Sequence, residues 1–268
     1  TQKEHLQRIL PLFIKFTDYS AIDPAIRQRF IVTLGKMIEE SSNDLSAFSD
    51  EHLVTMVHKI LIPNTIWRAK APNAAVRREA MHVIHIVMNQ YMQLLSKQNR
   101  TSLLQAFAEE DSWKHIIACL DEDEAELRML AVKTIALLLG TQVSHMLNES
   151  QFKSASEELL KRMNDNQEKI RVQTSATIGI LCVHMPASVV SAQEQLKSII
   201  TSLTVYLDDP VADVQRAVSD SLTSIMHKYA AQQQHMSMFK AILDQALNVH
   251  MRKSNVMQLL QTLASIAK

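Results

Sequence analysis

Glycine is almost absent from this sequence, with three residues in 268, whereas glycine makes up about 7% of an average protein. Glycine forms the tight turns of β-hairpins and the loops that cradle phosphate groups. Its scarcity therefore argues against dense β structure, a Walker-type nucleotide site and a dinucleotide-binding fingerprint. An all-helical chain is the fold class that remains.

Cysteine is nearly as scarce. Cys119 and Cys182 both lie in apolar helical patterns, and the sequence contains no Cys-x-x-Cys pair. This composition argues against the common zinc and redox motifs. Sparse cysteine is typical of reducing compartments such as the cytosol and the nucleus, and we expect a cytoplasmic protein.

Charge of one sign and long apolar runs are also missing. The 28 basic residues balance the 28 acidic ones, so the chain lacks the positive excess that binding to nucleic-acid phosphates requires. No run of about 18 apolar residues is long enough to span a bilayer, and no signal segment precedes the first helix pattern. We expect neither a nucleic-acid nor a membrane partner. The chain begins Thr-Gln-Lys-Glu without an initiator methionine, and we expect a fragment whose missing part lies N-terminal to it.

A recurring unit is the main feature that the sequence does contain. An apolar residue, usually followed by a basic one, begins a run of apolar residues at three- and four-residue spacing, which is typical of one helix face. The second positions of the five units are Arg27, Arg77, Arg128, Arg171 and Gln215. Their spacings of 50, 51, 43 and 44 residues are close to the repeat length of about 40–47 in HEAT and armadillo proteins.

Each of these helices is preceded by another apolar segment, at 6–16, 53–61, 113–120, 152–163 and 196–207. Two helices per repeat predict an all-α HEAT-repeat solenoid, a right-handed superhelix of about six helix pairs. We expect a single domain over 1–268, with repeats at 1–43, 50–96, 100–142, 148–186, 189–231 and 234–268. The last pair, near 235–249 and 253–266, lacks the repeated basic residue and would form a C-terminal cap.

Short polar residues precede the repeated position in every unit. Asp23, Asp123, Asp165 and Asp209 lie four to six residues before it, and Asn73 takes this place in the second unit. Such side chains can cap the second helix or pair with the arginine of a neighbouring unit. The adjacent carboxylates of Asp208 and Asp209 therefore fit a repeat device better than a catalytic pair. We expect a structural ladder made of Asp23, Arg27, Arg77, Asp123, Arg128, Asp165, Arg171, Asp209 and Gln215.

Motifs of catalysis are absent. The sequence has no HExxH, no G-x-S-x-G and no glycine-rich phosphate loop. His82 with His85, and His115 with Cys119, could each offer two metal ligands from one helix face. Neither pair has an evident third ligand, and zinc takes at least three from the protein. We expect no enzymatic activity, no cofactor and no metal.

One segment, IPNTIWRAKAPNAAVRRE at 62–79, is a candidate interaction site. We expect it to join the two helices of the second repeat through about ten residues, where about two to eight are usual. It carries Trp67, Arg68, Lys70, Arg77 and Arg78, and Trp and Arg are enriched among interface anchors. Alternatively, the Trp67 ring folds back to cover an edge of the core. Both interpretations are open at this point.

Several of these segments resemble those of a known family. They are WRA at 67–69 with AVR at 75–77, ELLKR at 158–162 with IR at 170–171, and LDDP at 207–210. In order and spacing, from about position 67 to the C-terminus, they resemble the C-terminal region of the HEAT-repeat axonemal dynein assembly factors. The resemblance implies a non-catalytic cytoplasmic scaffold that helps to preassemble dynein arms for motile cilia. It also implies binding to dynein heavy or intermediate chains and to chaperones.

Two alternatives come from other classes. A tubulin-binding HEAT array of the TOG type uses aromatic and basic residues on the turns within its repeats, and it needs them on successive turns along one edge. A nuclear transport receptor would continue for many more repeats with an acidic inner surface. The client and the oligomeric state are unknown from the sequence.

Overall fold

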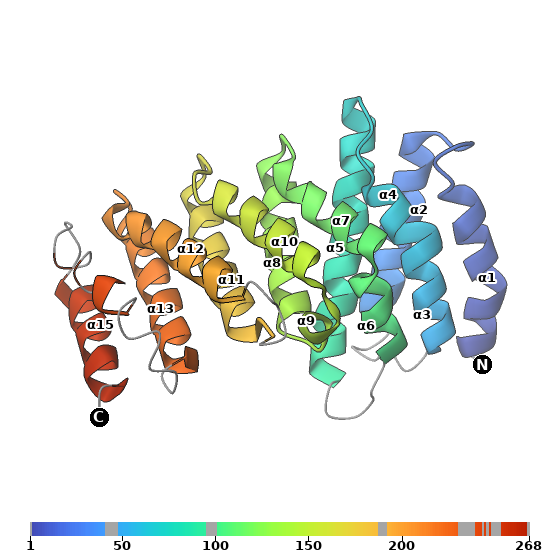
Figure 1. Ribbon diagram of the computed structural model, residues 1–268. Coiled ribbons are helices and arrows are strands. Elements are labelled where there is room, and N and C mark those ends of the chain that lie inside the picture. Colours follow the sequence, from blue (N-terminus) through green and yellow to red (C-terminus); the bar gives the residue numbers. More distant parts are fainter. Residues whose placement is uncertain are drawn as a thin grey trace. The chain divides into compact units, whose positions relative to one another are not determined.

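The structure is a computed structural model that describes residues 2–40, 48–94, 101–186, 192–229, 239–242, 244, 247 and 253–266. Every regular element in these residues is a helix (Figure 1), which confirms the predicted fold class. Contacts between Cα atoms divide the chain into two compact units, Thr1–Leu147 and Asn148–Lys268. The division falls at the expected start of the fourth repeat, and a single solenoid across both units stays a prediction.

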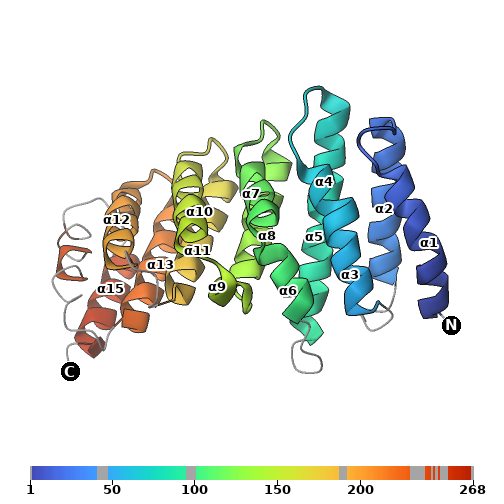
Figure 2. The same ribbon diagram turned by 45° about the vertical axis from the view of Figure 1, so that its right-hand side comes forward.

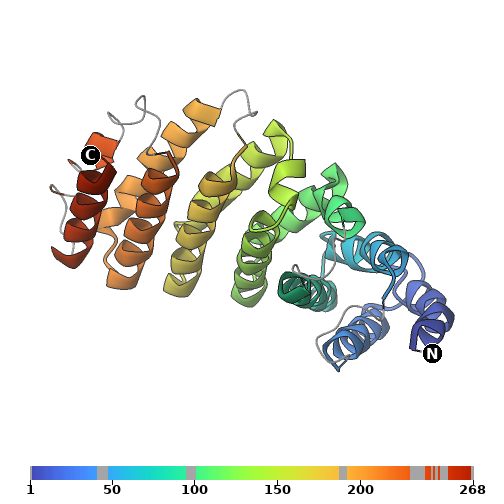
Figure 3. The ribbon, with the colours of Figure 1, turned by 90° about the horizontal axis from the view of Figure 1, so that it is seen from below.

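Unit 1 consists of two layers of helices. The first layer holds α1 (Gln2–Phe16), α3 (Asp50–Met56) with its continuation through η2 (Val57–Leu61) and α4 (Ile62–Thr65), α6 (Thr101–Ala108), and α7 (Glu110–Ala118) with η3 (Cys119–Asp121). The second layer holds α2 (Pro24–Glu40), α5 (Ala71–Leu94) and α8 (Ala125–Leu139), and the short α9 (Val143–Met146) follows. Helix α2 packs against α5 and α5 against α8, while α1 contacts α3 and α3 contacts α6 (Figure 3). Within each layer, the corresponding helices of successive repeats therefore pack against one another, as in HEAT-type repeats.

Unit 2 repeats this arrangement. Helices α10 (Glu149–Arg162) and α12 (Ala192–Val205), the latter extended by η4 (Tyr206–Asp208), form one layer. Helices α11 (Glu168–His184), α13 (Ala212–Tyr229) and α15 (Lys253–Ile266) form the other, with α13 in contact with both neighbours. Most of the expected helix at 235–249 lies outside the described residues.

The apolar register of the second helices forms the core of each unit. In α13, the side chains of Val218, Leu222, Ile225 and Met226 are all buried, because residues three and four apart share one helix face. The corresponding positions of α5, α8 and α11 are buried in the same way. Where α11 meets α13, Gly179 allows close approach, since a Cβ atom there would lie 3.0 Å from the Ser221 Cβ atom.

The connection within 62–79 is shorter than the predicted length of about ten residues. Residues 62–65 form α4 and α5 already begins at Ala71, so only residues 66–70 join the two helices. Pro63 lacks the N–H group that a continuing helix needs. The chain nevertheless stays helical there, because a turn of π-helix, in which the Ile62 N–H donates to the Val57 carbonyl, precedes the proline. Arg77 and Arg78 consequently lie in α5 and not in the connection.

Candidate functional site

The turns between the paired helices of unit 1 lie side by side along one edge. They comprise residues 17–23, 66–70 and 122–124 and lie at the top of Figures 1 and 2. We call these three segments the turn edge. It contains most of the interaction residues predicted from the sequence.

A buried network joins the first two turns. The Arg27 guanidinium is 2% exposed and donates to the Asn64 Oδ1 atom at 2.8 Å and to the Asn73 Oδ1 atom at 2.7 Å. The Asn64 amide in turn donates to the carbonyl oxygen of Thr17 at 3.0 Å, and the Asn73 amide to that of Ala69 at 2.7 Å. Two neutral amides thus tie the turns to a buried cation. Asn64 was not predicted as a site residue, because it lies on the first helix rather than in the repeated motif.

Arg68 is fixed in place on this edge. Its guanidinium carbon lies 3.9 Å from the centre of the Tyr19 ring, within the range of a cation–π interaction. Its Nη1 atom donates to the carbonyls of Pro63 at 3.0 Å and Ile66 at 3.3 Å. The Arg68 carbonyl accepts from Arg77 Nη1 at 2.9 Å. Burial lowers the pKa of the Arg68 guanidinium from its ordinary value, and nearby Arg77 lowers it further, whereas Tyr19 opposes the shift.

Trp67 does not fold back over the core, because it is 66% exposed. On the first turn, Tyr19 is 50% exposed. Lys70 is also exposed, and its φ of 82° places it in the left-handed region, which is uncommon for residues other than glycine. The Asn73 N–H group donates to the Lys70 carbonyl at 3.1 Å and helps to hold this conformation. The second turn therefore exposes an aromatic ring and a cation on a backbone that is held by hydrogen bonds.

Arg77 and Arg78 differ from these residues because their charges are compensated. The Arg77 Nε atom lies 2.5 Å from the Glu122 Oε1 atom, and both side chains are buried. Arg78 pairs with Glu124 and lies 3.8 Å from Glu126. The acid that joins Arg77 is thus Glu122, one residue before the Asp123 that the ladder was expected to use. Arg77 and Arg78 connect the second turn to the third and present little free charge.

The side chain at the repeated basic position makes a contact that the sequence did not predict. In every repeat but the first, this side chain donates a hydrogen bond to a carbonyl of the turn that precedes its own helix. Arg77 donates to Arg68, Arg128 to Glu122 and Asp123 at 2.8 Å each, Arg171 to Asp165 at 2.9 Å, and Gln215 to Asp209 at 2.9 Å. An amide can donate in this way as well as a guanidinium, so Gln215 keeps this bond without the charge.

The aspartates of the expected ladder mainly accept hydrogen bonds from the backbone at the start of their own helix. The side chains of Asp23, Asp165 and Asp209 accept from the backbone N–H groups of Ala25, Gln167 and Val211 at 2.8, 3.0 and 2.8 Å. Asp209 also accepts from Arg171 Nε at 3.0 Å and Nη2 at 3.1 Å, which connects two successive turns of unit 2. Asp123 is exposed and contributes its carbonyl to Arg128.

The candidate metal ligands have other neighbours. The His85 Nδ1 atom lies 3.3 Å from the Thr134 hydroxyl, and burial lowers the pKa of His85. The Cys119 thiol donates to the His115 carbonyl at 3.4 Å. Burial raises the pKa of Cys119 and of Cys182 to about 12. Within the described residues, no three His, Cys, Asp or Glu side chains converge on a point where a metal ion could sit.

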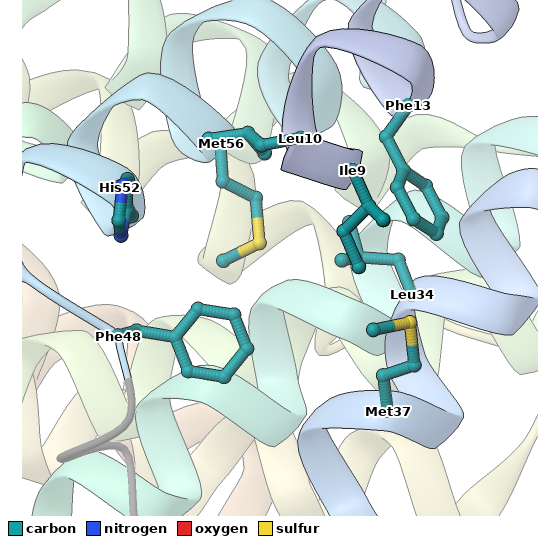
Figure 4. A pocket seen from close by; sticks show the side chains of 8 residues that line it. All are labelled: Ile9, Leu10, Phe13, Leu34, Met37, Phe48, His52 and Met56. Atoms are coloured by element: carbon teal, nitrogen blue, oxygen red, sulfur yellow. The ribbon is translucent and has the colours of Figure 1, made fainter. Parts of the chain in front are cut away.

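Two hollows lie between helices in the described part of the chain. One pocket, between α1, α2 and α3, is lined by seven apolar side chains and His52, whose Nδ1 atom is buried without a partner (Figure 4). In unit 2, a hollow of about 420 Å³ lies between α11 and α13 beside Gly179, and His184 and Asp220 are among its lining residues. In the first pocket, the single imidazole of His52 lacks the second group that acid–base catalysis needs. No helix in the described parts of the chain is long and apolar enough to cross a membrane.

Comparison with known proteins identifies distant relatives. The chain is 25% identical over 204 residues to dynein axonemal assembly factor 5 of Xenopus laevis, which covers 75% of this chain and 23% of that protein. It is 23% identical over 223 residues to the Mus musculus protein of the same name, covering 82% of this chain and 25% of that protein. The chain thus spans about a quarter of the length of these relatives. No family model matches the chain.

Solved structures show the same fold. A designed armadillo repeat protein matches over 95% of this chain and 99% of its own length, with a TM-score of 0.59 and 16% identity. This likeness confirms the HEAT or armadillo type of repeat solenoid. The predicted resemblance to dynein assembly factors is likewise confirmed by the two relatives.

Proposed function

We propose that this chain is a non-catalytic scaffold that acts in the cytoplasmic preassembly of axonemal dynein arms for motile cilia. Its partners are dynein heavy or intermediate chains, the chaperones that accompany them, or both. The observation that carries the proposal is the similarity to dynein axonemal assembly factor 5 over 75–82% of the chain. The proposal concerns the region in hand, since the similarity covers about a quarter of each relative.

The repeat architecture supports a scaffold. Stacked helix pairs offer an extended surface to large clients, and a solenoid can carry several binding segments at once. The described residues offer no group of metal ligands. These observations favour a protein that holds other proteins over one that transforms a small substrate.

The turn edge of unit 1 is the contact surface that we propose. An exposed tryptophan and a positioned arginine are typical of interface anchors. Trp67 and Arg68 provide these two residue types on the second turn, and Lys70 adds a second cation. Arg77 and Arg78 support this surface from α5 through Glu122 and Glu124. They act in the proposal as positioning residues, which modifies the sequence-based view of them as direct contacts.

Capture from an extract of cells that are building motile cilia tests the proposal. The immobilised chain should retain dynein heavy or intermediate chains above a control whose exposed residues have been scrambled. If both proteins capture these chains equally, or neither does, the dynein-assembly proposal is wrong.

Tubulin binding is a second candidate, favoured by one observation. Tyr19 and Trp67 are both exposed on adjacent turns, as a TOG-type surface requires. The third turn opposes this interpretation because it carries Glu122, Asp123 and Glu124 in place of aromatic or basic residues. Co-sedimentation with microtubules and co-elution with free tubulin on gel filtration test it, and failure of both would exclude this candidate.

A further inference from the structure

Positive charge is unevenly compensated along the turn edge. Arg77 and Arg78 each pair with a glutamate. By contrast, within the part of the chain that the structure describes, Arg27, Arg68 and Lys70 have no carboxylate within ion-pair distance. The Nη atoms of Arg27 and the Nη1 atom of Arg68 bind amide and carbonyl oxygens instead, and the buried Nε atom of Arg27 has no hydrogen-bond partner. Neutral acceptors leave the charge of Arg68 in place beside that of Lys70, so the second turn keeps a local positive field, whereas the charges of Asp23 and Asp18 act on Arg27.

Trp67 lies within this field and has the properties of an anchor. Its ring is 66% exposed, and covering it would remove a large apolar surface from water. The adjacent backbone is already ordered, because Arg77 and Asn73 bind the carbonyls of residues 68, 69 and 70. A binding partner would therefore not have to order this turn, which is how preorganised surfaces gain affinity.

We propose that the second turn of the edge binds a short acidic, extended segment of a partner protein, with Trp67 as the apolar anchor and Arg68 and Lys70 as cationic contacts. The inference deepens the proposed function and rests on it for the identity of the partner. An extended segment fits because the three turns lie side by side along one edge (Figures 1 and 2). Acid-rich segments are commonly disordered and free to follow such an edge.

The flanking acids set the length of this segment and argue against nucleic acid. Asp18 and Asp23 on the first turn, and Asp123 on the third, are exposed. They would repel a long polyanion that runs along the whole edge. A local cluster of carboxylates over the second turn avoids them, and an apolar residue of the same segment can cover Trp67. With a net charge of zero, the chain also lacks the broad basic surface typical of nucleic-acid binding.

A pair of fluorescein-labelled peptides tests the inference. One has the repeating unit Glu-Glu-Leu and the other Lys-Lys-Leu. Anisotropy measured at low and at physiological salt should show binding of the acidic peptide only, and this binding should weaken with salt because exposed ion pairs are screened. Trp67→Ala should weaken it about 30-fold, the effect of losing an interface anchor. Lys70→Glu should weaken it about 5-fold through lost attraction, whereas Lys36→Glu, an equal charge change on an exposed residue of α2, should not.

The two tryptophans provide an independent readout. Trp113 is 1% exposed and Trp67 is 66% exposed, so acrylamide quenching in the folded chain reports on Trp67. The acidic peptide should protect the fluorescence from acrylamide, and the basic peptide should not. Circular dichroism checks that each variant is folded, and Lys70→Gly, which fits the positive φ, provides a second charge-removing variant.

The outcomes separate this inference from the proposed function. Preference for Lys-Lys-Leu or for an oligothymidine strand, or acidic binding that is unaffected by Trp67→Ala and Lys70→Glu, would overturn the acidic-segment inference. If the acidic peptide fails to bind while dynein capture still depends on Trp67, the inference is wrong and the proposed function stands. If the peptide binds as expected but no dynein chain is captured, the inference stands and the proposed function is wrong.

Discussion

Removal of the Arg171 side chain should destabilise unit 2 strongly. Its guanidinium donates to both carboxylate oxygens of Asp209, at 3.0 and 3.1 Å, and to the Asp165 carbonyl at 2.9 Å. The side chains of Arg171 and Asp209 are only 14% and 6% exposed. Arg171→Ala would therefore leave a buried carboxylate that still accepts from the Val211 N–H group.

The magnitude follows from the burial of this pair. Breaking a buried ion pair by removing one partner costs about 3–5 kcal/mol, because the other charge stays buried. The remaining backbone donor to Asp209 places Arg171→Ala at about 3 kcal/mol, the low end of that range. Asp209→Ala should cost a similar amount. The double variant should cost about 2 kcal/mol less than the sum of the two, since the unpaired charge disappears.

Urea denaturation with two probes measures the effect and its location. Both tryptophans, Trp67 and Trp113, lie in unit 1, so their fluorescence follows that unit, whereas circular dichroism at the helix band follows both. In a repeat protein, a perturbation acts mainly on its own and neighbouring repeats. Arg171→Ala should shift the circular dichroism transition and leave the fluorescence transition nearly unchanged, and Arg77→Ala should shift the fluorescence transition. Unchanged unfolding in both variants, or additive losses in the Arg171–Asp209 cycle, would refute the ladder.

Three further predictions use other features. Lys70→Gly should be about 1 kcal/mol more stable than Lys70→Ala in urea denaturation, because only the alanine is strained at positive φ. Equal stability of the two variants would argue against the left-handed conformation of residue 70. Gly179→Ala should cost about 1–3 kcal/mol by overpacking, since its Cβ atom would lie 3.2 Å from the Ser221 backbone. Gly140→Ala, whose nearest atom is at 3.4 Å, should change stability by no more than about 0.5 kcal/mol, and an equal loss in both variants would contradict the packing argument. Burial raises the pKa of the Cys119 and Cys182 thiols to about 12, so the unfolded chain releases these protons at a lower pH than the folded chain. The free energy of unfolding should therefore fall as the pH rises from about 9 towards 12. Iodoacetamide labelling at pH 8 that is faster than unfolding would contradict this burial.

The apolar periodicity predicted the fold because it depends on local geometry. Spacings such as Val218, Leu222 and Ile225 fix one helix face wherever the helix is placed, and their burial follows. The connection in the second repeat was expected to be about ten residues long, whereas α4 ends at Thr65 and α5 begins at Ala71. A π-turn before Pro63 and the position of Pro72 in the first turn of α5 accommodate both prolines within helices.

The site was harder to predict because its contacts join distant segments. The sequence placed Trp67, Arg68 and Lys70 in one turn, but it could not show that Arg68 lies over the Tyr19 ring. It also placed the ladder acid at Asp123, whereas the acid next to Arg77 is Glu122. Adjacent positions of a turn point in different directions, so their roles are set by backbone dihedral angles that sequence spacing does not contain.

The most direct test of the proposed role is quantitative affinity purification of this chain from ciliating cells. Mass spectrometry would compare the wild type with the variant that combines Trp67→Ala and Arg68→Glu, and with Lys36→Glu as a charge control. We predict that axonemal dynein chains are enriched with the wild type and the control and are lost with the double variant. Equal recovery with all three proteins would contradict the turn edge as the contact surface, and enrichment of tubulin or of no specific protein would contradict the dynein-assembly role itself.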